Sequence, residues 1–342
     1  MKRPMLKPII KTAFALGIAA VTVATHATVI ETTSPICVGA LTPIQGNGGS
    51  GVKISGFSQR MVQPVQYAGT VTSALHTSLG DSNATWVNGQ FGANGIAAYV
   101  EFDNGWTIDI ADTSASSQTL VLAGNLDGIV AVGNAYRIRP HMTVAALFGP
   151  NNESGLLAGL NPAQSDNILL SIPQTQQTLT IFYFSNALAK GWLRADFSPV
   201  GNQIIYPEQG VLVRRIVPGD INLLTLGVVR AGVIAVPVEP GFNILGTLKS
   251  SSNLPLSALN LYTGDLNTGI ASGLNLVDSD VLLMLQPDGS TRSFFYFKNA
   301  AFSGWLDASF NSADLTLVNA GTCFFIRRKP SNGPFFWTIP SE

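Results

Sequence analysis

The sequence has little charge and few cysteines. Nineteen basic and twenty acidic residues make up 11% of the 342-residue chain, and the formal net charge is −1. Low charge beside 46% hydrophobic residues excludes a disordered chain. A net charge near zero argues against a basic nucleic-acid-binding surface. Two cysteines are too few for a disulfide-dense small domain. The composition therefore indicates a globular protein with substantial apolar cores.

The scarcity of histidine and cysteine also limits the chemistry that the chain can perform. His76, His141, Cys37 and Cys323 lie far apart in the sequence, whereas a zinc site needs ligands at recognisable spacing. Gly80-Asp81-Ser82 is similar to an esterase opening, but no histidine follows residue 141 to serve as the base. We therefore expect no metal, no cofactor and no catalytic residue. A secreted hydrolase with scattered acidic residues is the weakest alternative.

The N-terminus has the three parts of a secretory signal peptide. Four basic residues within the first eleven are followed by an apolar run over 12–23 and by Thr25-His26-Ala27, which offers a cleavage site. We predict cleavage after Ala27 and a secreted or cell-envelope location. No later run is long and apolar enough for a transmembrane helix. Export would permit a disulfide between Cys37 and Cys323, with two buried thiols as the alternative.

The second half of the chain repeats itself at an offset of 113 residues. Phe-Tyr-Phe-x-Asn-Ala occurs twice, each time followed by Gly-Trp-Leu and later by Arg-Arg. The matching positions are 182–187 with 295–300, 191–193 with 304–306, and 214–215 with 327–328. We predict an internal duplication, with copies over roughly 140–216 and 240–328.

The alignment of the two copies extends upstream of the aromatic motif. Ser165-Asp166 matches Ser279-Asp280, and Pro140 with Val144 matches Pro240 with Ile244. Because side chains alternate along a strand, one arginine of each pair faces inwards, where a carboxylate could pair with it. A solvated strand end is the alternative.

Short apolar runs rich in Val, Ile, Phe and Tyr predict an all-β protein. Asp103-Asn104-Gly105 and Pro287–Ser290 have the composition of hairpin turns, and only 154–160 and 256–262 are candidate helical segments. We expect a small N-terminal β-barrel followed by two duplicated antiparallel β-sandwich or barrel units with minor helical turns. The predicted parts are a signal peptide (1–27), an extended segment (28–65), a β-barrel (66–139), the first copy (140–216), a strand-rich bridge (217–239), and the second copy with a C-terminal tail (240–342).

One tryptophan occupies the same position in each copy. Exposed Trp192 and Trp305 could form platforms for sugar rings, as in a carbohydrate-binding module. The favoured alternative is that each ring fills the core of its unit, since one large aromatic residue per β-unit is usually buried.

The stretch at 33–39 has the sequence Thr-Ser-Pro-Ile-Cys-Val-Gly. It precedes a predicted small β region and two units with aromatic strands. Each unit has one Trp and a closing strand that begins at Gly and ends at Arg. In this layout the chain resembles an uncharacterised family of secreted, duplicated β-domain proteins from verrucomicrobial bacteria. The resemblance covers nearly the whole chain after the signal peptide, and it implies an exported β protein without catalytic residues.

The second copy is also similar to the Gly-Trp-Asn-Leu-Ile-Gly β-modules of secreted bacterial surface proteins. Here the motif is Gly241–Gly246, with Phe242 in place of Trp, and Asp280 and Tyr296 follow in the order of that module. The first copy departs from the motif at 141–143.

These observations together predict an exported, non-enzymatic cell-surface or extracellular protein with a structural or interaction role. Its expected partners are other copies of itself or a component of the envelope or extracellular matrix, because few charges keep such surfaces apart. A carbohydrate-binding surface module that uses Trp192 and Trp305, with polysaccharide as the partner, is the alternative. We expect no nucleic-acid partner.

Overall fold

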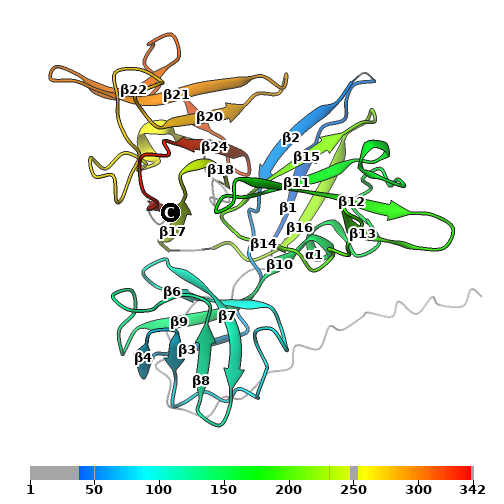
Figure 1. Ribbon diagram of the computed structural model, residues 1–342, viewed down its shortest axis with the longest axis vertical. Helices are drawn as coiled ribbons and strands as arrows, with labels where there is room; N and C mark the ends of the chain where they lie inside the picture. The colour runs from blue at the N-terminus through cyan, green and yellow to red at the C-terminus, as the bar shows by residue number, and fades with distance from the viewer. Residues whose placement is uncertain (1–37, 50, 231, 247–252, 340–342) are drawn as a thin grey trace, which may run out of the picture. The chain divides into compact units, whose positions relative to one another are not determined.

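Antiparallel β-strands form nearly all of the regular structure, which confirms the predicted all-β fold class (Figure 1). The computed structural model describes residues 38–49, 51–230, 232–246 and 253–339. The predicted signal peptide and Cys37 lie outside these residues. The helical turns of the described chain are Val144–Phe148 (α1), Pro162–Gln164 (η1) and Leu256–Ala258 (η2).

One of the two predicted helical segments is wrong. Residues 154–160 are not helical, because the chain turns at Gly155, where φ is 76°, and Gly159 then bridges to a neighbouring strand residue, Phe184. The other candidate, 256–262, begins with the short turn η2.

A seven-stranded antiparallel sheet forms an open half-barrel (hereafter the half-barrel). Its strands, in the order β3-β9-β6-β7-β8-β5-β4, are Tyr67–Thr70 (β3), Ala135–Pro140 (β9), Ala98–Phe102 (β6), Thr107–Ser114 (β7), Thr119–Leu122 (β8), Ser78–Gly80 (β5) and Ser73–Leu75 (β4). Gly105 takes a φ of 91° in the predicted turn between β6 and β7, a conformation that glycine adopts without strain. Alternating side chains fill the core with residues such as Phe91, Val100 and Leu120.

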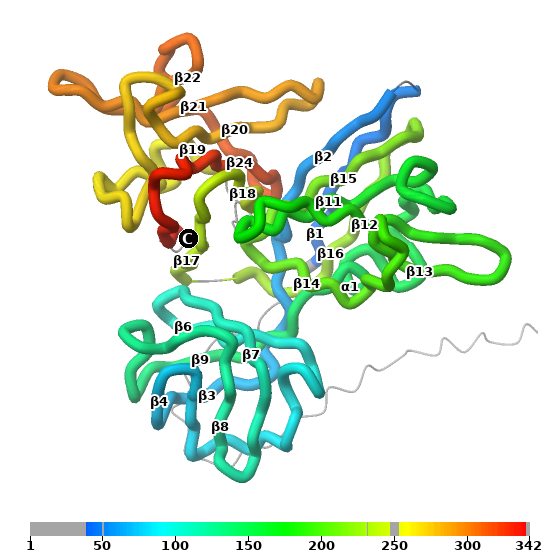
Figure 2. Tube along the Cα trace, viewed as in Figure 1, coloured from blue at the N-terminus to red at the C-terminus, as the bar shows by residue number. Residues whose placement is uncertain are grey.

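The strands that flank the half-barrel in the sequence build a second body, here called the first sandwich. Its strands are Val38–Ile44 (β1), Lys53–Ser58 (β2), Met142–Thr143 (β10), Asn167–Ile172 (β11), Gln177–Ser185 (β12), Lys190–Arg194 (β13), Ile204–Ile205 (β14), Gly210–Arg215 (β15) and Ile221–Gly227 (β16). A five-stranded sheet, β13-β12-β11-β15-β2, packs with the ribbon β1·β16 around one apolar core. In Figure 2 the blue tube of β1 and β2 runs beside the green tube of β15 and β16.

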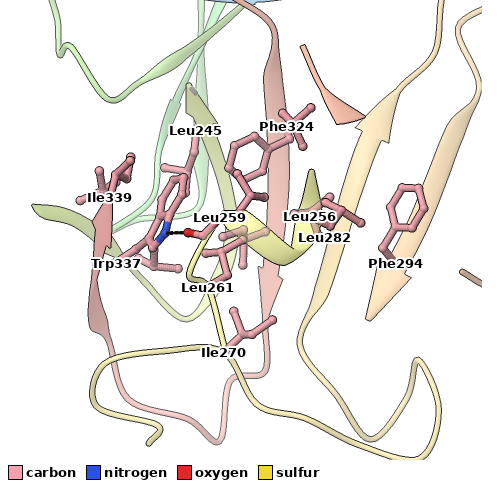
Figure 3. Close-up of a cluster of buried hydrophobic side chains, with 14 of the residues drawn as sticks. Leu245, Leu256, Leu259, Leu261, Ile270, Leu282, Phe294, Phe324, Trp337 and Ile339 are labelled. Carbon is pink, nitrogen blue, oxygen red and sulfur yellow. Dashed lines mark hydrogen bonds between the residues drawn. The ribbon is translucent and has the colours of Figure 1, made fainter. Parts of the chain in front are cut away.

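The remaining strands form the second sandwich. They are Ile234–Val238 (β17), Gly241–Gly246 (β18), Leu254–Pro255 (β19), Val281–Leu285 (β20), Thr291–Lys298 (β21), Ser303–Asp307 (β22), Leu317–Val318 (β23), Cys323–Arg328 (β24) and Phe335–Ile339 (β25). The five-stranded sheet has the order β18-β24-β20-β21-β22. Trp337 is part of the core and has no exposed surface, and its indole nitrogen donates to the Leu259 carbonyl at 2.7 Å (Figure 3).

The two sandwiches have the same series of strand pairings. The first strand of each pairs with the last, as β1 with β16 and β17 with β25, and the second pairs with the last but one, as β2 with β15 and β18 with β24. The short pairs β10·β14 and β19·β23 also correspond. The half-barrel therefore lies in the chain between the second and third strands of the first sandwich.

This arrangement corrects the upstream part of the sequence alignment. Val144 lies in α1, whereas Ile244 lies in β18, so the two residues are not equivalent. The strand that matches β18 is β2, because each lies beside the closing strand that ends in Arg-Arg. Residues within 28–65 and 217–239 thus belong to the sheets of the sandwiches. The half-barrel separates β2 from the later strands of the first sandwich in the sequence, so a local comparison of sequences does not find this match.

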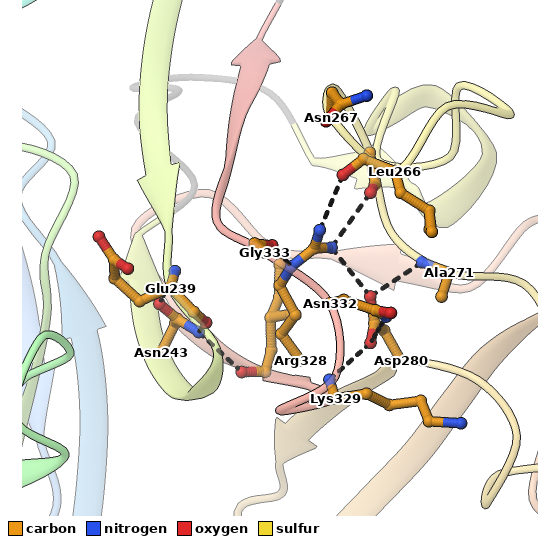
Figure 4. Close-up of polar contacts among 12 residues, drawn as sticks. Glu239, Asn243, Leu266, Asn267, Ala271, Asp280, Arg328, Lys329, Asn332 and Gly333 are labelled. Carbon is orange, nitrogen blue, oxygen red and sulfur yellow. Dashed lines mark hydrogen bonds and ion pairs between the residues drawn. The ribbon is translucent and has the colours of Figure 1, made fainter.

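A buried carboxylate–guanidinium pair recurs at the same place in both sandwiches. Asp166 Oδ2 lies 3.1 Å from Arg215 Nε, and Asp280 Oδ2 lies 3.1 Å from Arg328 Nη1, and none of these side chains is more than 3% exposed. Figure 4 shows that Asp280 also accepts the backbone N–H groups of Ala271 and Lys329. Of the two alternatives for the arginine pairs, burial against a carboxylate is therefore correct.

Loss of one partner from this pair should destabilise the second sandwich strongly. Arg328→Met leaves Asp280 as an uncompensated buried charge, which costs about 3–5 kcal/mol of unfolding free energy. Urea denaturation followed by tryptophan fluorescence measures this cost. Arg327→Met is the matched control, because Arg327 is the exposed neighbour on the other face of β24. Equal effects of the two substitutions would contradict this account of the pair.

Candidate functional site

The two tryptophans predicted as sugar platforms are core residues. Trp192 is 4% exposed and Trp305 is 2% exposed, and each belongs to the apolar core of its sandwich. The Trp192 indole nitrogen donates to the Gly149 carbonyl at 2.8 Å. A buried ring has no free face to present to a sugar, so these two residues are not a carbohydrate platform. The favoured alternative, core filling, is correct.

Of the two cysteines proposed to form a disulfide, the structure describes one. Cys323 is buried beside Leu212 and Ile244, where strands of the two sandwiches meet. Burial raises the pKa of its thiol to about 12, so the reactive thiolate is suppressed. Cys37 lies outside the described residues, and the disulfide remains a prediction.

A cavity of about 640 Å³ in the described part of the chain is lined by both sandwiches and the half-barrel. All of these residues belong to one compact unit. The half-barrel contributes residues of β6, β7 and the segment after β8. The first sandwich contributes residues of β11, β14 and the loop at 206–209. The second sandwich contributes residues of β17, β18 and β25. A concave site of this size with a mixed lining is typical of a ligand-binding pocket.

The hairpin between β6 and β7 brings an aromatic pair to the cavity. Gly105 approaches the second sandwich so closely that a Cβ atom there would lie 2.7 Å from the Val233 carbonyl oxygen. Its own carbonyl accepts the Ala235 N–H at 3.1 Å. The next residue, Trp106, is thereby placed against Phe336, with 3.9 Å between the ring centres. Both rings line the cavity and are partly exposed.

A polar cluster in the cavity joins the half-barrel to the first sandwich. Asp109 Oδ1 lies 3.1 Å from His141 Nε2, and Asp109 Oδ2 accepts the Tyr206 hydroxyl at 2.8 Å. Burial alone would raise the pKa of the Asp109 carboxyl, but His141 and Tyr206 together hold this pKa below its ordinary value. Asp109 is therefore the ionised acceptor of the cluster.

Two deeply buried polar atoms at the same cavity have neither a hydrogen-bond partner nor an ion-pair partner among the described residues. They are His141 Nδ1 and the Tyr99 hydroxyl, on side chains that are almost wholly buried, and their rings lie 5.0 Å apart. A buried polar group without a partner is costly in a folded protein. Both atoms are shielded from solvent, so they belong to the interior of the cavity wall.

Two further acids line the cavity, Glu208 and Glu239. Burial raises the pKa of the Glu208 carboxyl above its ordinary value, although the nearby charge of Arg230 opposes the rise. Behind the cavity wall, Glu101 forms ion pairs with both Arg139 and Arg230, at 2.5 and 3.0 Å. Burial would raise the pKa of Glu101, but the two guanidinium groups lower it overall.

Sequence reasoning missed this site because its members come from all three bodies. Asp109, His141 and Tyr206 have no motif spacing, and they meet only because β7, the end of β9 and the loop after β14 converge. The one local signal was the Asn-Gly turn, which predicted the hairpin that presents Trp106. Gly80-Asp81-Ser82 leads into a turn, and buried Asp81 has a structural role, since it accepts the Tyr136 hydroxyl at 2.7 Å.

Within the described ranges, no three His, Cys, Asp or Glu side chains gather closely enough to hold a metal ion. Among the helices that the structure describes, none has the length and apolar character needed to cross a membrane. No protein-family model, curated protein or solved structure matches the chain.

Replacement of the core tryptophans should affect stability and leave the cavity intact. Trp192→Ala and Trp305→Ala should each lower the unfolding free energy by about 3–5 kcal/mol, the usual cost of deleting a buried aromatic ring. Thermal and urea unfolding measure the loss, with Leu188→Ala, at a side chain that is 96% exposed, as the control. Wild-type stability in either tryptophan variant would show that the ring is not a core residue.

Proposed function

We propose that this chain is an exported, non-enzymatic cell-surface or extracellular protein that binds a saccharide of the envelope or extracellular matrix. The cavity beside Trp106 is the proposed binding site, in place of Trp192 and Trp305. The observation that carries the proposal is the union, in one cavity, of partly exposed aromatic rings with carboxylate and amide side chains.

The lining suits the two faces of a sugar ring. Trp106, Tyr206 and Phe336 offer aromatic surface, on which the apolar C–H face of a pyranose can pack. Amide and carboxylate groups nearby, such as those of Gln203 and Asp109, can bond to sugar hydroxyls. Polar groups of this kind give orientation and specificity, while the rings give binding area.

Two other expectations support an exported binding protein and remain part of the proposal. The N-terminal sequence has the pattern of a signal peptide, and the resemblance to the verrucomicrobial family implies export. The identical order of pairings in the two sandwiches supports an origin by duplication of one β-unit, followed by insertion of the half-barrel into the first copy.

Saccharide binding should depend on Trp106. Of the five tryptophans, Trp106 is partly exposed, and the other four are at most 5% exposed. Binding of an oligosaccharide should therefore change tryptophan fluorescence, and Trp106→Ala should weaken binding about tenfold or more, as expected for loss of an aromatic stacking partner. A panel of neutral, cationic and anionic oligosaccharides, titrated by fluorescence and calorimetry, provides the measurement.

Phe302→Ala is the control for this titration, because Phe302 is an exposed aromatic residue that does not line the cavity. Undiminished binding by Trp106→Ala would reject the cavity as the site. Shorter sugar products after incubation would show hydrolysis and reject the non-enzymatic part of the proposal.

Self-association is a second candidate function, and the ribbon β1·β16 favours it. Its outer face carries Leu41, Leu224 and Leu226, which are 61%, 54% and 64% exposed, and neither strand contains a charged residue. Edge strands usually carry charges that prevent pairing between molecules. An uncharged apolar ribbon is therefore a surface on which copies could pack.

A charge on this ribbon should reduce self-association. Leu224→Lys should shift the protein towards monomer in size-exclusion chromatography with light scattering at high concentration, because each contact would bury an unpaired charge. Leu188→Lys adds the same charge at an exposed site outside the ribbon and should change nothing. A wild-type protein that stays monomeric throughout would exclude this second function.

A further inference from the structure

The cavity carries negative charge without a matching cation in its lining. Asp109, Glu208 and Glu239 line it, and no lysine or arginine is among the described lining residues. His141 is the basic residue of the wall, and it already contacts Asp109. A ligand that enters this cavity is therefore exposed to more carboxylates than basic groups.

Two of the three carboxylates have no ion pair within the described part of the chain. These are Glu208 and Glu239, whereas Asp109 contacts His141 and accepts the Tyr206 hydroxyl. Arg139 and Arg230 leave one excess positive charge behind the wall, since both pair with Glu101. That single charge cannot balance two unpaired acids.

Aromatic rings beside unpaired carboxylates form a favourable environment for an ammonium group. The negative face of a ring attracts a cation, and the attraction grows as water is removed. The protein itself contains such a contact on its surface, where Lys298 Nζ lies 5.5 Å from the Tyr262 ring centre and 3.0 Å from the Tyr262 hydroxyl oxygen. Tyr206, Trp106 and Phe336 offer comparable rings in the cavity.

We propose that the ligand of this cavity carries a protonated amine, so that the saccharide it binds is built from amino sugars with free amino groups. The inference rests on the proposed saccharide-binding function and specifies its substrate class. The ammonium group would lie among Glu208, Glu239 and the aromatic rings, while the sugar hydroxyls would bond to polar side chains of the lining such as that of Gln203.

The elevated pKa of Glu208 gives the proposal a pH signature. A cation favours the ionised carboxylate, so bound amine lowers the pKa of Glu208 and binding releases protons where the free carboxyl is partly protonated. Affinity should therefore fall as the pH decreases through the pKa of Glu208 in the free protein. The fall should begin above the ordinary range of a glutamate.

The test compares oligomers that share a backbone and differ in charge. Glucosamine oligomers are cationic, N-acetylglucosamine oligomers of equal length are neutral, and galacturonate oligomers are anionic. Calorimetry at neutral pH should show the glucosamine oligomer binding about tenfold or more tightly than the neutral one, as for a desolvated ammonium on a ring and a carboxylate. The anionic oligomer should not bind.

Glu208→Gln and Glu239→Gln keep the shape of each side chain and remove its charge. Each should weaken binding of the glucosamine oligomer much more than binding of the neutral oligomer, and Glu208→Gln should also remove the fall in affinity that begins above the ordinary pKa range of a glutamate. Asp288→Asn is the control, because Asp288 is an exposed acid in the turn after β20 and does not line the cavity.

The outcomes separate this inference from the proposed function. Equal affinity for glucosamine and N-acetylglucosamine oligomers would overturn the charge assignment and retain saccharide binding. Binding of tetramethylammonium without any oligosaccharide would support the cation site and reject the saccharide. Failure of every oligomer and of tetramethylammonium to bind would overturn both.

Discussion

The buried pair of aspartate and arginine is the interaction on which each sandwich depends. The carboxylate of Asp166 or Asp280 accepts two backbone N–H groups as well as the guanidinium, so one side chain fixes the start of an inner strand, the end of the closing strand and a loop. Charged groups are tolerated at this depth only when paired and fully bonded. The pair therefore leaves little freedom in how the central strands meet.

The two sandwiches share the same order of strand pairings around the buried ion pair, but their outer surfaces differ. In the second sandwich, the ribbon β17·β25 contacts the hairpin of the half-barrel through Phe336 and Trp106. In the first, the outer face of β1·β16 exposes its leucines. The same arrangement of strands thus gives one ribbon that contacts the half-barrel and helps to form a cavity, and one ribbon whose leucines are exposed to solvent.

The chemistry of the cavity follows from where the half-barrel lies in the chain. Because the half-barrel leaves and rejoins the first sandwich between β2 and β10, Asp109 and His141 are brought close to the loop that carries Tyr206 and Glu208. The cavity wall thus combines carboxylates, amides and aromatic rings. These features support the proposed binding of an amine-bearing saccharide.

The sequence by itself determined the elements and their cores. Period-two apolar runs and the turns at Asn104-Gly105 and Asp288-Gly289 specify antiparallel strands, and the equivalent positions of Trp192 and Trp305 indicated core rings, because these signals are local. The tertiary structure alone decided that β2 is the counterpart of β18, and that Asp109, His141, Tyr206 and Glu208 share a cavity. Strand pairing and side-chain convergence across long loops depend on contacts between distant segments, which no spacing along the chain records.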